Sequence, residues 1–204
     1  MFTRMSRWGS PIVLAIAKLP ILSLASPNTI TVFGFIFSLG AGISLVARAY
    51  GCATLLLLLS YLCDVVDGAL ARQRRLTSSA GTVLDSLVDR YADFVMGLAV
   101  CLTVIDGAIW MVICCLSIFG SLMVSYTSAQ ARLFGLVIPF SWMKRFDRSV
   151  IVFFGISGCF LADSLSLSDP RMPMKVAILF LALGTNVSAL IRSHSLFKSL
   201  KIQS

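Results

Sequence analysis

Hydrophobic residues make up 58% of this 204-residue chain, and its mean hydropathy of +0.93 lies far above the range of water-soluble domains. Apolar stretches recur along the whole length, so we expect an all-α integral membrane protein with one domain over residues 1–204. The net charge of +8 would suit nucleic acid, but the basic residues gather at the ends of apolar segments. That distribution is typical of membrane topology and argues against a nucleic-acid partner.

Residues 10–24 are predicted to form an amphipathic helix at the membrane interface. Pro11, Lys18 and Pro20 interrupt the apolar run, so it is too short to span a bilayer. The basic residues before and within it suit a layer of lipid headgroups. The same interruptions, and the lack of a cleavage site after the basic N-terminus, argue against a cleaved signal peptide.

Six later segments approach the roughly 20 apolar residues that a membrane-spanning helix needs. The residues Ser26, Pro27 and Asn28 form a helix-start signal before the first of them. The predicted spans are residues 29–48, 53–73, 82–105, 108–128, 149–167 and 173–192.

The distribution of positive charge predicts the orientation of these spans. If both termini lie in the cytoplasm, the loops and span ends on the opposite side keep only Arg48, Arg171 and Lys175. This bias follows the positive-inside rule. We therefore expect a multi-pass protein of the cytoplasmic membrane, surrounded by membrane lipids, with the connection between the second and third spans on the cytoplasmic side.

Four aspartates stand at fixed spacing around that connection. Asp64 and Asp67 are three residues apart, and Asp85 and Asp89 are four apart, so each pair shares one face of its helix. A short basic turn joins the two helices, which should bring both faces together. Carboxylate oxygens are hard ligands that suit Mg²⁺ or Mn²⁺, and two such ions could clamp a diphosphate.

Two other interpretations of the aspartates remain open on spacing alone. Nearby arginines could neutralise them in a buried ion-pair network without metal. Carboxylates at membrane depth could also line the pathway of a cation or proton transporter. Against the transporter, the carboxylates lie on one side of the membrane, and small residues between Gly68 and Gly81 leave room for a larger ligand.

The full pattern resembles the signature of the CDP-alcohol phosphotransferase family. It reads Asp64-x-x-Asp67-Gly68-x-x-Ala71-Arg72-x(8)-Gly81-x(3)-Asp85-x(3)-Asp89 and matches at every defined position. Asn28 and Thr31, at the start of the first span, also resemble the family's first-helix motif. With six spans and a preceding interfacial helix, the resemblance covers most of the chain.

The resemblance implies a membrane enzyme, usually a homodimer, that transfers a phosphatidyl-type group from a CDP-linked lipid to an alcohol and releases CMP. It implies two Mg²⁺ or Mn²⁺ ions held by Asp64, Asp67 and Asp85. Asp89 would be the general base on the acceptor hydroxyl and a further metal ligand. The CDP site would be formed by Asn28, Thr31, Asp67, Gly68, Ala71, Arg72 and Gly81.

Further features resemble the branch of the family that uses inositol phosphate, including its archaeal members. Lys144-Arg145-Phe-Asp147-Arg148 opens the fifth span and Arg192 closes the sixth. A phosphorylated acceptor is dianionic, so Arg145, Arg148 and Arg192 are candidate ligands for its phosphate. Basic residues at span ends can also be topology signals alone.

The chain departs from that branch just after Ser125-Tyr126. Inositol-phosphate members usually carry basic residues in the next turn, where this chain has Thr127, Ser128, Ala129 and Gln130. Inositol phosphate is the preferred acceptor, with glycerol 3-phosphate and then free inositol as alternatives. An inactive lipid-binding protein is disfavoured because every catalytic position of the signature is filled.

Overall fold

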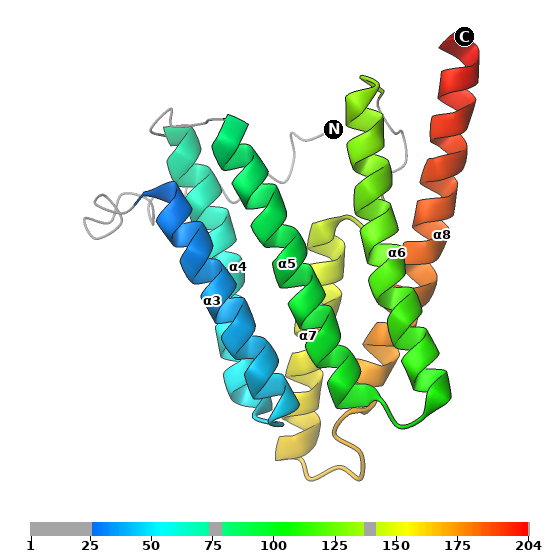
Figure 1. Ribbon diagram of the computed structural model, residues 1–204. Coiled ribbons are helices and arrows are strands. Elements are labelled where there is room, and N and C mark those ends of the chain that lie inside the picture. The colour runs from blue at the N-terminus through cyan, green and yellow to red at the C-terminus, as the bar shows by residue number, and fades with distance from the viewer. Residues whose placement is uncertain (1–25, 74–78, 137–141, 204) are drawn as a thin grey trace. The chain divides into compact units, whose positions relative to one another are not determined.

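The computed structural model describes residues 26–73, 79–136 and 142–203, and all regular structure in these ranges is α-helical (Figure 1). The predicted interfacial helix at 10–24 lies outside the described residues. The helices of the described ranges are α3 (Pro27–Val46), α4 (Tyr50–Gln73), α5 (Ser79–Val104), α6 (Ala108–Leu133), α7 (Arg145–Ser164) and α8 (Met172–Gln203).

The six helices correspond in order to the six predicted spans, and their ends have local causes. The predicted start signal is confirmed at α3, where the Ser26 hydroxyl accepts from the Thr29 backbone N–H at 3.2 Å and Pro27 is the first helical residue. α6 ends where Gly135 adopts a φ of +65°, a conformation that glycine takes without steric cost. α8 runs eleven residues past the predicted 192, because the polar stretch that follows contains no glycine or proline to stop it.

Four of these helices are long and apolar enough to cross a membrane. They are the segments Asn28–Val46, Tyr50–Leu70, Ala108–Leu133 and Met172–Lys201. The remaining two, α5 and α7, each contain four charged residues, and in α5 Asp85, Asp89 and Asp93 follow one another at intervals of one turn. Charged residues therefore recur within α5 and α7, whereas the other four helices are apolar along most of their length.

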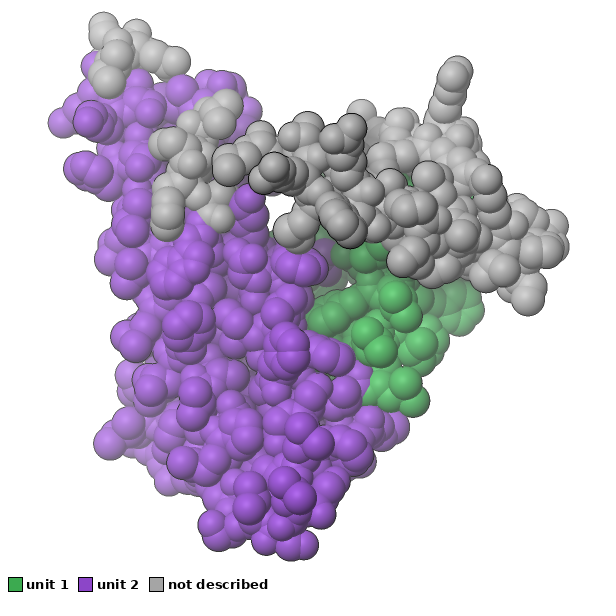
Figure 2. All heavy atoms as spheres, turned by 180° about the vertical axis from the view of Figure 1, so that it is seen from behind, with its two compact units in different colours: residues 1–43, 55–96 green, residues 44–54, 97–204 purple. Residues whose placement is uncertain are grey.

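The chain forms two compact units, coloured separately in Figure 2. The first consists of residues 1–43 and 55–96, and the second of residues 44–54 and 97–204. In the first unit α3 packs on α4: Ile30 of α3 and Val66 and Leu70 of α4 form a buried apolar cluster, joined by Cys63. This contact fixes the start of α3 against the part of α4 that carries the aspartates.

In the second unit α8 packs against both α6 and α7. Gly120 permits the approach of α6 to α8, because a Cβ at this position would collide with Thr185 and Asn186. Asn186 also donates to the carbonyl of Leu116 at 2.9 Å. Small residues and polar bonds of this kind are what hold helices together in a lipid environment.

An ion-pair network ties the α5–α6 connection to the start of α8 within the second unit. Asp106 accepts from Lys175 at 2.6 Å and from Arg171 at 2.8 Å. Asp169 accepts from the same two residues, at 2.8 Å and 3.1 Å. The Lys175 ammonium also lies 5.6 Å from the centre of the Trp110 ring. Arg171 and Lys175, two of the three basic residues expected opposite the aspartates, are therefore both paired with acids.

Candidate active site

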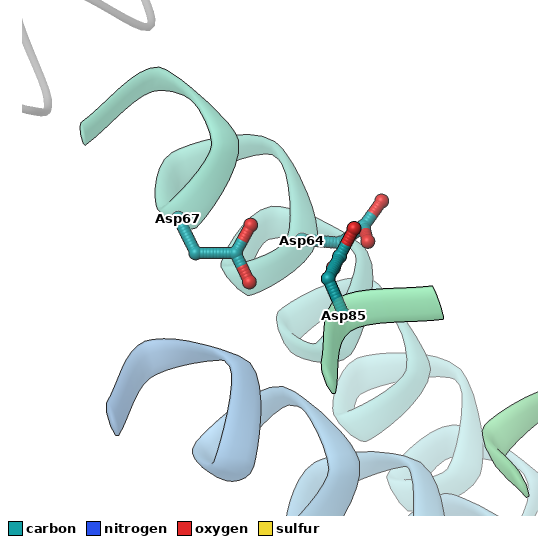
Figure 3. A group of neighbouring side chains, drawn as sticks. All are labelled: Asp64, Asp67 and Asp85. Carbon is teal, nitrogen blue, oxygen red and sulfur yellow. The ribbon is translucent and has the colours of Figure 1, made fainter. Parts of the chain in front are cut away.

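Three of the four signature aspartates meet in the first unit. One carboxylate oxygen from each of Asp64, Asp67 and Asp85 lies within 4.8 Å of the other two. Figure 3 shows Asp64 and Asp67 one turn apart on α4, with their carboxylates directed towards the same space as that of Asp85 on α5. The predicted convergence of the two helix faces is confirmed for these three residues.

The helical spacing explains why the carboxylates converge. Residues three apart on a helix lie about one turn apart on the same face, so Asp64 and Asp67 both face α5. Asp85 lies in the second turn of α5, after a connection short enough to keep the two helices side by side. Asp67 is the buried member, with 6% of its surface exposed, whereas Asp64 and Asp85 keep contact with solvent.

Asp67 is oriented by a threonine from α3. The Thr31 hydroxyl donates to Asp67 Oδ2 at 2.6 Å, a short bond of the kind that a charged acceptor makes. The apolar cluster around Ile30 holds the two backbones that carry this bond. Thr31, which the family resemblance assigned to the CDP site, therefore also contacts the carboxylate cluster directly.

The donor set suits a hard divalent cation. Mg²⁺–oxygen bonds of about 2.1 Å place ligands on one octahedral ion at most about 4.2 Å apart. The three carboxylate oxygens all lie within 4.8 Å of one another, which is close to that limit. Two-metal sites, in which the ions lie about 3.5–4 Å apart, also suit carboxylates gathered in this way. The residues present therefore fit a metal site.

Asp89 is not part of this group of three oxygens within the described residues. It lies one turn after Asp85 on α5, on the same helix face. One turn further, Asp93 pairs with Arg90 at 3.4 Å, on a partly exposed surface. The metal-ligand and general-base roles predicted for Asp89 both stay predictions.

The remaining residues of the predicted CDP site lie on the same helices. Asn28 is exposed in the first turn of α3, and Gly68 and Gly81 are half-buried on α4 and α5. Ala71 and Arg72 belong to the last turn of α4, and their side chains lie outside the described residues. Asn28, Thr31 and Gly68 thus belong to the α3–α4 pair that carries Asp67.

The three candidate acceptor arginines all belong to the second unit. Arg145 and Arg148 lie in the first turn of α7, which begins four residues before its predicted start. The Lys144 backbone N–H donates to Asp147 Oδ2 at 2.9 Å and closes that turn. Arg148 is 6% exposed and Arg192, on α8, is 3% exposed. Burial of this degree is unusual for arginines that act only as topology signals.

The hydrogen-bond partners of these arginines could not be assigned from the sequence. Arg192 donates to the Ser128 hydroxyl at 2.7 Å and to the Trp142 carbonyl at 2.7 Å. Arg148 donates to the Met143 carbonyl at 3.1 Å. Ser128 lies in the turn after Tyr126, where a basic residue was expected and is absent. That departure was the only feature of the sequence that drew attention to Ser128. Backbone carbonyls leave no signal in a sequence.

Comparison with known proteins gives a family and a fold. A family model described as CDP-alcohol phosphatidyltransferase matches residues 24–188. The archaetidylinositol phosphate synthase of Pyrococcus horikoshii is 31% identical over 131 residues, which cover 63% of this chain and 67% of that protein. The phosphatidylinositol phosphate synthase of Streptomyces avermitilis is 29% identical over 174 residues, or 82% of this chain and 70% of that protein.

The phosphatidylinositol phosphate synthase of Mycobacterium tuberculosis has a similar fold. Its crystal structure with CDP-DAG bound matches 93% of each chain with a TM-score of 0.72 at 22% identity. Its complex with manganese and citrate matches 92% of this chain and 88% of that one, with a TM-score of 0.74 at 21% identity. At this level of identity the likeness shows the fold.

Proposed function

We propose that this chain, which belongs to the CDP-alcohol phosphatidyltransferase family, moves a phosphatidyl-type group from a CDP-linked lipid to an inositol phosphate and releases CMP. Family membership makes the chain a transferase of phospholipid biosynthesis. The observation that carries the proposal is the meeting of Asp64, Asp67 and Asp85, which the family signature spaces along α4 and α5, within 4.8 Å. The donor is CDP-diacylglycerol or an ether-lipid equivalent.

Asp64, Asp67 and Asp85 are proposed to hold two Mg²⁺ or Mn²⁺ ions, with Asp89 as a further ligand. A bound divalent metal neutralises and polarises the diphosphate of the donor. The hard carboxylate donors support this assignment, as does the manganese in a complex of the M. tuberculosis protein. Thr31 would keep Asp67 in the orientation that ligation requires.

Asp89 is proposed to act as the general base. It accepts the proton of the acceptor hydroxyl, whose oxygen attacks the phosphorus that bears the lipid. The bond from that phosphorus to the bridging oxygen breaks, and CMP leaves with the electron pair. The nucleotide is proposed to bind along α3, α4 and α5 at Asn28, Thr31, Asp67, Gly68, Ala71, Arg72 and Gly81.

Inositol phosphate is the proposed acceptor, for two reasons. Relatives named for the synthesis of archaetidylinositol phosphate and phosphatidylinositol phosphate align over much of the chain. The second unit also buries two arginines, Arg148 and Arg192, as a dianionic phosphate would require, and Arg145 shares the first turn of α7 with Arg148.

Glycerol 3-phosphate is the second candidate acceptor. The observation that favours it is the uncharged turn after Tyr126, where Ser128 binds Arg192 and no basic side chain occupies residues 127–130. Both acceptors carry a phosphate and a free hydroxyl, so contacts between the arginines and the phosphate do not distinguish them. The difference must come from contacts with the rest of the acceptor.

The assay is CMP release by the purified full chain in detergent, with CDP-diacylglycerol and Mg²⁺ or Mn²⁺. Inositol phosphate, glycerol 3-phosphate, inositol and serine are offered one at a time, and Asp89→Asn serves as the inactive control. CMP release with inositol phosphate alone supports the proposal. Release with glycerol 3-phosphate alone overturns the acceptor and keeps the reaction class. A fully active Asp89→Asn variant overturns the assigned base.

The membrane arrangement is also a proposal. We infer that α5 and α7 span the membrane together with the four apolar helices, with both termini and the aspartates on the cytoplasmic side and the protein in the cytoplasmic membrane. Residues 10–24 are proposed to lie at the interface, and two copies of the chain to form a homodimer. The family match runs through both compact units, which supports one functional domain over 1–204.

A further inference from the structure

Two buried arginines of the second unit are held by consecutive backbone carbonyls. Arg192 of α8 donates through Nη2 to the Trp142 carbonyl at 2.7 Å. Arg148 of α7 donates through Nη1 to the next carbonyl, that of Met143, at 3.1 Å. Two guanidinium groups of like charge are thereby fixed beside each other. Asp147, on the same turn as Arg148, accepts from the Lys144 backbone N–H at 2.9 Å.

The backbone at Met143 has an unusual conformation that allows this. Its φ is +55°, in the left-handed region that side chains with a Cβ rarely adopt. Met143 is nevertheless almost fully buried, with its side chain seated against Gly184 of α8, where a Cβ would collide with it. The Ser188 hydroxyl adds a third donor, to the Trp142 carbonyl at 2.6 Å. Backbone in this conformation costs free energy and persists only where the surrounding contacts hold it.

Ser128 of α6 supplies the other half of the Arg192 environment. Its hydroxyl donates to the Val124 carbonyl at 2.8 Å, so its lone pairs remain for Arg192 Nη1, which lies 2.7 Å away. The same Nη1 also donates to the Val124 carbonyl at 3.3 Å. The guanidinium of Arg192 is therefore clamped between α6 and the Trp142–Met143 turn.

The hydrogen bonds to α6 and to Trp142 leave the Nε edge of the Arg192 guanidinium without a partner in the described part of the chain. A guanidinium has five N–H groups, of which three make the bonds described above. The Nε–H is buried and has no hydrogen-bond partner within the described part of the chain. A buried donor without a partner is costly, and the cost is removed when an anion binds there.

We propose that Ser128 and the Trp142–Met143 turn are positioning elements that direct the unused edge of Arg192, beside Arg148, at the phosphate of the acceptor. This inference rests on the proposed function, because it assumes a phosphorylated acceptor. Ser128 does not contact the acceptor and acts through Arg192. Ser128 lies where members of the inositol-phosphate branch usually carry a basic residue. In this chain it would contribute to phosphate binding indirectly, by holding Arg192 of α8 in place.

The test compares three variants of the full chain in detergent. Ser128→Ala removes the hydroxyl that holds Nη1, and Ser128→Thr keeps it. Ser195→Ala is the matched control, because the Ser195 hydroxyl makes the same kind of bond to the carbonyl four residues earlier on α8, at 2.9 Å. Kinetic constants for inositol phosphate and for the CDP-lipid are measured separately.

In Ser128→Ala we expect the KM for inositol phosphate to rise about tenfold, as expected for loss of one hydrogen bond to a charged group. The KM for the CDP-lipid should stay at the parent value, a separation that general unfolding would not produce. Ser128→Thr and Ser195→Ala should behave like the parent. An unchanged acceptor KM in Ser128→Ala, or an equal rise of both KM values, would overturn the inference.

Binding of inorganic phosphate to the substrate-free protein, measured by calorimetry, separates this inference from the proposed function. Weaker phosphate binding in Ser128→Ala than in the parent supports the positioning role even if inositol phosphate proves to be the wrong acceptor. Equal phosphate affinity in the two proteins, or no phosphate binding to the parent, would overturn it. Failure of CMP release with every phosphorylated acceptor would instead contradict the proposed function.

Discussion

The hydrogen bond from Thr31 to Asp67 gives the sharpest test of how the carboxylate cluster is built. Thr31→Val keeps the shape of the side chain and removes the hydroxyl that lies 2.6 Å from Asp67 Oδ2. Asp67 is 6% exposed, so water cannot easily replace the lost donor. A hydrogen bond to a charged group contributes about 1.5–3 kcal/mol, which corresponds to about a 10- to 150-fold change in an equilibrium constant.

We therefore expect Thr31→Val to weaken Mn²⁺-dependent binding of the CDP-lipid by at least about tenfold, measured by calorimetry in detergent. Thr31→Ser, which keeps a hydroxyl, should restore most of the affinity. Thr54→Val is the control, because the Thr54 hydroxyl donates at 2.9 Å to a carbonyl of its own helix. Parent-like binding in Thr31→Val, or an equal loss in Thr54→Val, would contradict the orienting role of the Thr31 hydroxyl.

Asp85→Ala should abolish metal-dependent nucleotide binding, and a metal titration with the parent affinity would contradict its assignment as a ligand. The hydrogen bond from Lys175, together with those from Arg171, lowers the pKa of Asp169 to about 2, below its unfolded value of about 3.9. The stability that Asp169 contributes is therefore present above pH 4 and lost as the pH falls towards 2, so Asp169→Asn should flatten the fall of the melting temperature across that range; a parent-like acid profile would contradict this. Gly120→Ala should destabilise the protein by about 1–3 kcal/mol, because the added Cβ collides with Asn186 and Thr185, and an unchanged melting temperature would show that α8 can move aside.

The sequence predicted the helices and the convergence of three of the four aspartates, because both depend on periodicity. Apolar segments of membrane-spanning length mark the helices, and the i, i+3 spacing of Asp64 and Asp67 places both on one face. The resemblance to the CDP-alcohol family, which rests on the same spacing, is confirmed by the match over residues 24–188. Helix ends were less accurate: α8 continues to Gln203 because nothing in its polar extension stops a helix.

The environment of the arginines could not be predicted in the same way. The carbonyls of Trp142 and Met143 are bonded as they are because Met143 adopts a φ of +55°. That conformation is set by packing against Gly184 and by donors from two other helices, and a methionine in the sequence gives no sign of it. The serine at 128 looked like a missing contact, although it binds the arginine that the sequence assigned to the acceptor.

The most direct test of the account is CMP release from CDP-diacylglycerol and inositol phosphate by the purified protein, measured with Mg²⁺, with Mn²⁺ and with a chelator. We expect CMP release to require both the acceptor and a divalent metal, and to disappear in Asp64→Ala, because this substitution removes one of the three carboxylates that α4 and α5 bring together. CMP release that persists in the chelator or in Asp64→Ala would contradict it. So would a folded parent protein that neither binds CDP nor releases CMP.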